Sequence, residues 1–179
     1  MVAALVLSPW PAYGRAMQQI YAIALGSNMR HGRFGRPEAV LALALRQLDA
    51  GATRVLVRSP VRRSAPLGPS LRTYANAAAL LETDLMPEDL LDHLKQMERD
   101  FGRRPGGQAW RARPLDLDIL LWSGGPYASK HLCIPHRFMA VRDFVLTPLC
   151  DIAPDWRDPL SGLTARHLKA RLDQKRPAA

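Results

Sequence analysis

The segment Arg113–Leu121 constrains the fold of this chain more than any other stretch. Aliphatic residues alternate with other residues along it, and turn-forming residues precede it, which predicts a β-strand. Successive side chains of a strand point to opposite faces, so Asp116 and Asp118 are expected side by side on one face. The aliphatic residues between and around them are expected on the other face, in a core.

Two adjacent carboxylates repel each other, so folding alone gives no reason to place them together. Divalent cations give a reason, because Mg²⁺ prefers a few carboxylate oxygens together with waters and phosphate oxygens. The alternative is a half-exposed strand whose aspartates pair with surface arginines. A lone Asp-x-Asp match does not decide between these two interpretations.

Hydrophobic patterning predicts a regular series of strands and helices around this segment. Helices are expected to begin at Pro37 and Pro87, because proline is favoured at the first helical position, and to end near residues 51 and 101. Strands are expected at 20–25, 54–58, 74–81 and 113–121. The order β-α-β-β-α-β predicts an α+β, ferredoxin-like sandwich with an antiparallel sheet. Short helices around 138–151 and 163–173 are expected to be added at its C-terminal end.

The size and composition suit one compact domain, with 179 residues of which 47% are hydrophobic. Residues 1–18 are predicted to be an irregular extension in which Met17 is an alternative start, and residues 19–179 one domain with a basic tail. No apolar run is long enough to span a bilayer, and no secretory signal is recognisable, so a cytoplasmic location is expected. Cys133 and Cys150 lack metal-ligand spacing and are expected to be reduced, buried thiols.

The chain is basic, with 25 Lys and Arg against 16 Asp and Glu and a formal charge of +9. Such a surplus attracts polyanions, either nucleic acid or a nucleotide triphosphate. Arginines and glycines concentrate in residues 102–113, directly before the aspartates, and arginine binds phosphate as a rigid bidentate fork. A basic loop that leads into a carboxylate pair suits phosphoryl transfer, although a loop kept soluble by its charge is the alternative.

Other candidate residues are informative only in combination. Asn76 lies within a run of alanines, with Tyr74 on the same strand face, and its amide can read a heterocycle or bond to backbone. Glu98 lies at the edge of an apolar helical stripe, where a structural glutamate that reaches solvent is the simpler interpretation. His136 and Arg142 together suggest a second phosphate-binding group, whereas a lone histidine is more often a cap or a core residue.

Taken in order, these motifs resemble the 6-hydroxymethyl-7,8-dihydropterin pyrophosphokinase family of folate biosynthesis. The matching segments are 24–28 (Ala-Leu-Gly-Ser-Asn), 64–69, 74–78, 98–103, 113–119, 134–136, 142–146 and 152–154. The resemblance extends over roughly residues 19–160, which makes it far more specific than any single motif. The family's fold is the same ferredoxin-like sandwich.

The resemblance implies transfer of pyrophosphate from ATP to the pterin's hydroxymethyl group, with release of AMP and direct in-line attack on the β-phosphorus. It implies that Asp116 and Asp118 hold two Mg²⁺ ions and act in catalysis with Arg103 and Arg113. The ATP-binding residues that it implies are Glu98, Arg103, Trp110, Arg113, Ile119, His136 and Arg142. The pterin-binding residues that it implies are Ser64, Ala65, Leu67, Tyr74, Asn76 and Phe144.

Two positions in the basic loop depart from the family's pattern. Arg111-Ala112 follows Trp110 where the family has Gly-Pro, and Pro105 stands where the family has a second arginine. Both departures are expected to affect loop closure, and therefore rate or nucleotide affinity, without affecting the aspartate pair.

Two rival functions remain open at this stage. The fold and the positive charge also suit a nucleic-acid-binding ferredoxin-like module, although the aspartate pair would repel a phosphate backbone. A disabled relative that serves as a scaffold is the other. The enzyme hypothesis implies small-molecule substrates, a monomer, and neither a nucleic-acid nor a membrane partner.

Overall fold

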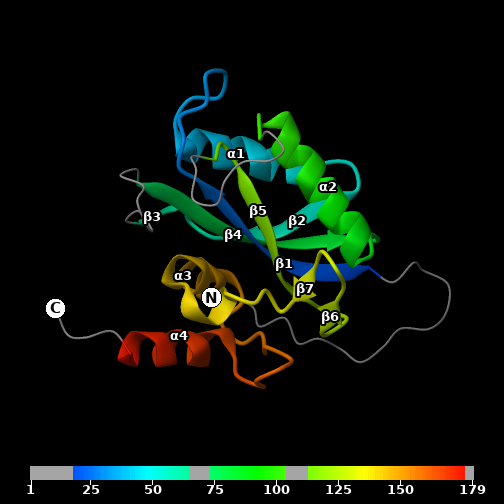
Figure 1. Ribbon diagram of the computed structural model, residues 1–179, viewed down its shortest axis with the longest axis vertical. Coiled ribbons are helices and arrows are strands. Elements are labelled where there is room, and N and C mark those ends of the chain that lie inside the picture. The colour runs from blue at the N-terminus through cyan, green and yellow to red at the C-terminus, as the bar shows by residue number, and fades with distance from the viewer. Residues whose placement is uncertain (1–17, 65–72, 104–112, 176–179) are drawn as a thin grey trace.

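The computed structural model describes residues 18–64, 73–103 and 113–175 (Figure 1). Its elements are β1 (Gln19–Ser27), α1 (Pro37–Leu48), β2 (Thr53–Arg58), β3 (Arg62–Ser64), β4 (Tyr74–Thr83), α2 (Pro87–Asp100), β5 (Asp116–Trp122), β6 (Tyr127–Ala128), β7 (Cys133–Ile134), a 3₁₀ turn (Met139–Val141), α3 (Asp143–Ile152) and α4 (Ala165–Gln174). The predicted β-α-β-β-α-β series is confirmed. The short strand β3 and the β6–β7 hairpin were not predicted.

The main sheet has the strand order β2-β4-β1-β5, and each of these neighbouring pairs is antiparallel. β3 pairs with the beginning of β4. This is the ferredoxin-like arrangement, with the first strand in the centre, so the predicted fold class is confirmed. In the register of the sheet, Gly26 of β1 lies opposite Asn76 of β4 on one side and Asp116 of β5 on the other.

Both faces of the sheet carry helices, which gives three layers (Figure 1). Tyr21, Ile23 and Leu25 of β1 are buried against α1 and α2, which begin at the predicted prolines. The intervening Ala22 and Ala24 belong to a second apolar cluster with α3 and α4. The period of two along β1 therefore divides the molecule into two cores.

β5 shows the predicted alternation. The side chains of Leu115, Leu117 and Ile119 are at most 2% exposed and pack in the α1–α2 core. Asp116 and Asp118 lie on the other face, where their side chains are 30% and 36% exposed. The prediction of one apolar face and one acidic face is confirmed.

The two C-terminal helices were predicted, and ion pairs attach them to the sheet and to each other. Arg62 of β3 donates two hydrogen bonds of 2.9 Å to Asp151 of α3. Lys169 of α4 lies 3.2 Å from Asp143 at the start of α3. The first turn of α4 is capped by Thr164, whose hydroxyl oxygen accepts the backbone N–H of His167. α3 is thereby held beside β4, the strand that carries Asn76.

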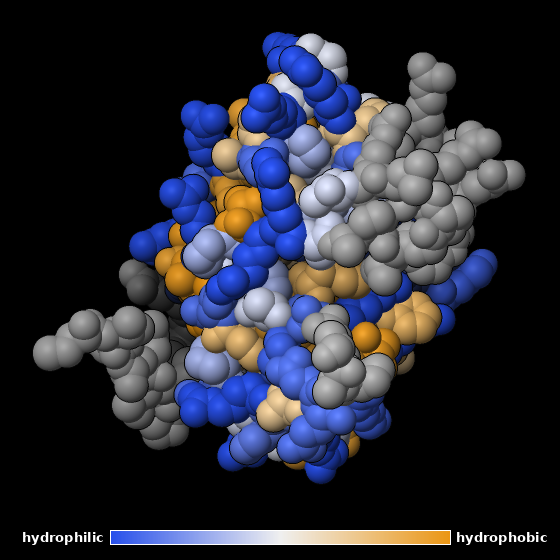
Figure 2. Space-filling view, turned by 90° about the vertical axis from the view of Figure 1, so that its left-hand side faces the viewer, coloured by the Kyte–Doolittle hydropathy of each residue, from blue (hydrophilic) through white to orange (hydrophobic). Residues whose placement is uncertain are grey.

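Other expectations have mixed outcomes. Cys133 and Cys150 are free thiols, but both are half-buried rather than buried, so that part of the prediction is wrong. The extension at residues 1–17 lies outside the described residues. None of the helices described here has the length and apolar character needed to cross a membrane. Figure 2 shows hydrophilic residues interspersed with small apolar patches on one side of the surface.

Candidate active site

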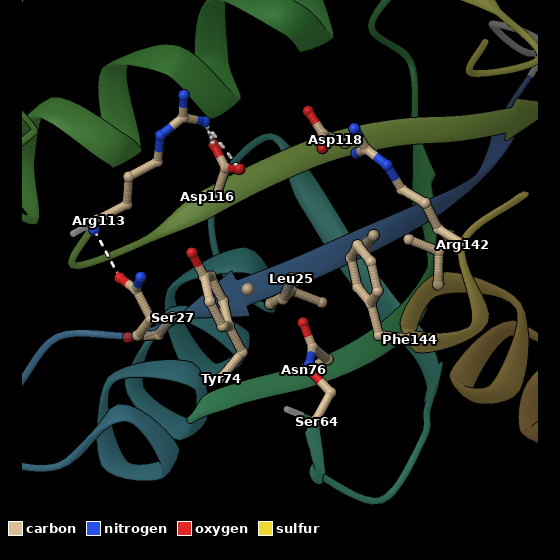
Figure 3. A pocket seen from close by; sticks show the side chains of 14 residues that line it. Leu25, Ser27, Ser64, Tyr74, Asn76, Arg113, Asp116, Asp118, Arg142 and Phe144 are labelled. Carbon is tan, nitrogen blue, oxygen red and sulfur yellow. Dashed lines mark hydrogen bonds and ion pairs between the residues drawn. The ribbon is translucent and has the colours of Figure 1, made fainter. Parts of the chain in front are cut away.

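A cavity of about 260 Å³ lies on the α3 side of the sheet, where β1 ends between β4 and β5 (Figure 3). It brings together residues that are far apart in the sequence. Its lining consists of Ala24, Leu25, Gly26, Ser27, Asn28, Ser64, Tyr74, Asn76, Arg113, Asp116, Asp118, Arg142, Phe144 and Val145. Most of the predicted pterin, phosphate and metal residues that the structure describes are therefore neighbours.

The cavity exists because β1 presents small residues to it. A Cβ atom added at Gly26 would lie 3.7 Å from Oδ1 of Asn76 and 3.9 Å from Cβ of Asp116. With Ala24 two residues earlier, the floor of the site is largely backbone. Larger side chains at these two positions would occupy the space between the amide and the carboxylate.

One end of the cavity is a slot between two aromatic rings. Tyr74 of β4 and Phe144 of α3 stand on either side of the open space, and Asn76 lies beneath it (Figure 3). The amide Nδ2 of Asn76 donates a 2.8 Å hydrogen bond to Oγ of Ser64, which fixes the amide plane. Such a slot suits a flat ring, because aromatic faces stack on it and the amide reads its edge.

The other end of the cavity holds the aspartate pair with its arginines. Nη1 of Arg113 lies 2.8 and 2.9 Å from the two carboxylate oxygens of Asp116. Arg103 donates a further hydrogen bond of 2.9 Å to Oδ1 of Asp116. Asp118 is less constrained, with the imidazole Nε2 of His136 at 4.0 Å. In this structure Asp116 is thus engaged by two guanidinium groups.

Glu98 is placed differently from the sequence interpretation. Its side chain does not reach solvent at the edge of α2, because it is only 1% exposed. The interpretation of Glu98 as a structural glutamate that reaches solvent is therefore wrong. It accepts the backbone N–H of Leu117 at 2.7 Å, pairs with Lys95 at 2.9 Å, and bonds to Arg103. Burial raises the pKa of Glu98, and Lys95 together with the Leu117 N–H opposes that shift. Glu98 fixes Arg103 and β5, while its contact with a nucleotide stays a prediction.

His136 lies at the edge of the site, with Nε2 toward Asp118. Burial lowers the pKa of His136, an effect that the nearby carboxylate of Asp118 opposes. The backbone N–H of Phe138 donates to Nδ1 of His136 at 3.3 Å, so the neutral ring carries its proton on Nε2. Nε2–H therefore points toward Asp118 at the acidic end of the cavity.

Arg142 provides a third cationic group. Its guanidinium lies 4.7 Å from the centre of the Phe138 ring and 5.8 Å from that of Phe144. Stacking of this kind holds the guanidinium plane while leaving its N–H donors free for an anion. Arg142 therefore links the aromatic slot to the acidic end of the cavity.

The remaining predicted residues do not add side chains to the described site. Ile119 is 2% exposed and packs in the α1–α2 core, away from the face that carries the aspartates. Ala65, Leu67 and Trp110 lie outside the described residues, as do the departures at positions 104–112.

Two lining residues with polar side chains were not among the predicted site residues. Ser27 and Asn28 end β1 and follow it, and both are at most 3% exposed. Oδ1 of Asn28 accepts the backbone N–H of Arg113 at 2.7 Å. The Gly26-Ser27-Asn28 motif was the available signal, but a turn after a strand has too many ordinary explanations to assign a role.

The aspartate pair fits magnesium rather than a cation held by protein ligands alone. Asp116 and Asp118 share one face and remain partly open to the cavity. The described residues contain no group of three or more His, Cys, Asp or Glu side chains that could hold an ion. Two carboxylates completed by water and substrate phosphates are the donor set that Mg²⁺ uses in phosphoryl-transfer sites.

A ferredoxin-like sandwich with an acidic pair, convergent arginines and a flat aromatic slot in one cavity defines a class: enzymes that transfer a phosphoryl group to a heterocyclic substrate. The family model for 7,8-dihydro-6-hydroxymethylpterin-pyrophosphokinase (HPPK) matches residues 22–154. The chain belongs to this family.

Similar proteins agree with this assignment. A 2-amino-4-hydroxy-6-hydroxymethyldihydropteridine pyrophosphokinase from Pseudomonas aeruginosa is 40% identical over 154 residues, covering 85% of this chain and 88% of the relative. A protein of the same name from Haemophilus influenzae is 38% identical over 155 residues, covering 86% and 93%. Among solved structures, Plasmodium falciparum HPPK-DHPS with pteroate aligns with a TM-score of 0.69 at 13% identity. That alignment covers 88% of this chain but 46% of the parasite protein, and it supports the fold alone.

Proposed function

We propose that this chain transfers pyrophosphate from ATP to the hydroxymethyl group of 6-hydroxymethyl-7,8-dihydropterin, giving AMP and the pterin diphosphate. Membership of the family and the names of its relatives support the reaction. The observation that carries it is the single cavity that joins the slot between Tyr74 and Phe144 to the pair Asp116 and Asp118. A ring bound in the slot would present its substituent to phosphates held at the acidic end.

The pterin would lie between the two rings, with its edge against Asn76. Ser64 holds the amide of Asn76 in one orientation, so the slot selects a heterocycle with a complementary donor and acceptor pattern. A preorganised amide of this kind contributes discrimination because an unmatched buried polar group costs about 1–3 kcal/mol.

The triphosphate would lie at the other end, among Arg103, Arg113, His136 and Arg142. The guanidinium groups would donate to phosphate oxygens, and the Nε2–H of His136 would donate to them as well. Two Mg²⁺ ions at Asp116 and Asp118, when bound, would neutralise charge on the phosphate chain. The protein groups would then hold the β-phosphorus in line with the substrate hydroxyl.

Direct transfer is the mechanism that the lining supports. The cavity-lining residues that the structure describes include no cysteine or lysine. An activated thiol or amine is therefore not available there for a covalent intermediate. Positioning and electrostatic stabilisation are the contributions that this constellation supplies. A monomeric state and a cytoplasmic location are further parts of this proposal.

The test is the nucleotide product, followed by ³¹P NMR with ATP, Mg²⁺ and the hydroxymethyl dihydropterin. Pterin-dependent AMP and a pterin diphosphate are expected. ADP would mean ordinary kinase chemistry at the γ-phosphorus, and pterin binding without any product would indicate a disabled relative.

Asp118→Asn is expected to lower turnover at least about 100-fold with an unchanged thermal transition, because the carboxylate is partly exposed and outside the core. Tight Mg²⁺-independent RNA binding in a gel shift would instead favour the nucleic-acid module.

A further inference from the structure

Asn28 joins the end of the central strand to the residue that precedes β5. Its Oδ1 accepts the backbone N–H of Arg113 at 2.7 Å, and its own N–H donates to the carbonyl of Arg113 at 3.3 Å. The two residues are 85 positions apart in the chain. Asn28 thus binds both backbone polar groups of Arg113, and the residue is only 3% exposed.

This anchor acts where the position of a side chain matters most. Arg113 is three residues before Asp116 and directs Nη1 to both of that carboxylate's oxygens (Figure 3). The guanidinium reaches Asp116 from the backbone position that the two hydrogen bonds to Asn28 hold. A shift of about 1 Å at such a group costs up to about 100-fold in rate.

The contribution of Asn28 to folding stability does not by itself explain why an asparagine occupies this position. The N–H of Arg113 can only donate, so the amide of Asn28 is oriented with its oxygen toward Arg113 and Nδ2 on the other side. Nδ2 is buried and has no hydrogen-bond partner among the described residues. An unpaired buried donor offsets much of the stability that the Oδ1 bond supplies.

We propose that Asn28 is a positioning residue for Arg113: it clamps the Arg113 backbone so that the guanidinium serves the phosphate end of the cavity. The inference rests on the proposed function, because it takes that role of Arg113 from it. Asn28 acts through Arg113, so its effect exists only while the guanidinium is present.

The first measurement concerns the anchor itself in the ligand-free protein. Asn28→Ala is expected to speed amide hydrogen exchange at Arg113 by at least about tenfold while lowering Tm by less than about 5 °C. An unchanged exchange rate would overturn the inference, because the N–H of Arg113 would then be protected without the hydrogen bond to Asn28.

The second measurement is a double-mutant cycle on affinity for a non-hydrolysable ATP analogue with Mg²⁺ and on kcat. Asn28→Ala alone is expected to lower kcat by about 10- to 100-fold. Added to Arg113→Ala, it is expected to change either quantity by less than about twofold, because the group that it positions is gone. Losses that multiply in the double variant would show an effect independent of Arg113 and would refute positioning.

The matched control is Thr164→Ala, which removes a side-chain bond to a backbone N–H at the start of α4, outside the cavity. It is expected to lower Tm while leaving kcat within about twofold. A fall in kcat as large as that of Asn28→Ala would mean that lost stability explains both. If the parent forms no pterin-dependent AMP, the proposed function fails, while hydrogen exchange and analogue affinity still decide the role of Asn28.

Discussion

Arg113→Ala is expected to raise the affinity of the nucleotide-free protein for a divalent cation. Asp116 is already engaged by Arg113 and Arg103, at 2.8–2.9 Å, on the oxygens that a metal ion would use. A cation must displace those guanidinium groups or share the carboxylate with them. Removing Arg113 eliminates two of these contacts and leaves the one from Arg103.

The size of the effect follows from the exposure of the pair. Arg113 and Asp116 are 35% and 30% exposed, so the interaction lies between a screened surface pair, at most about 1 kcal/mol, and a buried charge-assisted bond, about 1.5–3 kcal/mol. The free energy of the Arg113–Asp116 interaction is accordingly about 1–1.4 kcal/mol. Its loss lowers the Kd for the cation by roughly 5- to 10-fold.

The assay is a Mn²⁺ titration followed by electron paramagnetic resonance at about 0.15 M salt, where long-range charge effects are screened beyond about 8 Å. Arg142→Ala is the matched control, because Arg142 lines the same cavity and has no ion pair with either aspartate among the described contacts. It is expected to raise Mn²⁺ affinity by less than about twofold. Equal gains in the two variants would show that loss of positive charge suffices, and no gain in Arg113→Ala would refute competition for Asp116.

Three further outcomes are expected. Asn76→Ala should weaken pterin binding at least about tenfold in calorimetry while nucleotide affinity stays within about twofold, and equal losses would place the pterin elsewhere. Glu98→Gln should lower the free energy of unfolding by about 1–3 kcal/mol in urea titrations, because Lys95 and Arg103 lose a buried charged partner; an unchanged midpoint would contradict this. Because burial lowers the pKa of His136 below its usual 6.5, protonation opposes folding, so stability should fall as pH drops below about 6.5. His136→Gln should lose less stability than the parent protein over that pH range. If the stability of the two proteins, measured without nucleotide or metal, falls in parallel, titration of His136 is not the cause.

The sequence was sufficient where the determining pattern is local. The period of two in β5 predicted which face carries Asp116 and Asp118, because alternation is a property of the strand itself. The prolines at positions 37 and 87 predicted where α1 and α2 begin, since that residue is tolerated at the first turn. The ferredoxin-like order followed from the succession of these elements.

Contacts between distant segments were not predictable in the same way. Glu98 lies at the edge of its helical stripe, yet β5 and Arg103 cover that edge and supply partners for the carboxylate, so the side chain is buried. The bond between Asn28 and Arg113 depends on two loops meeting beside the central strand. No periodicity encodes such a meeting, and a resemblance identifies motifs without stating which of their atoms touch.

The alternation along β1, β4 and β5 has an evolutionary consequence. On β5, Leu117 belongs to the core that holds the domain together, while the residues on either side of it line the cavity. The core side chains and the cavity-lining side chains of β5 are therefore under different selective pressures, although they alternate within one short segment. Outside the aspartate pair, substitutions at positions that line the cavity can change ligand preference while the α1–α2 core on the other face keeps its packing, which makes such a sheet a durable scaffold for diverging specificities.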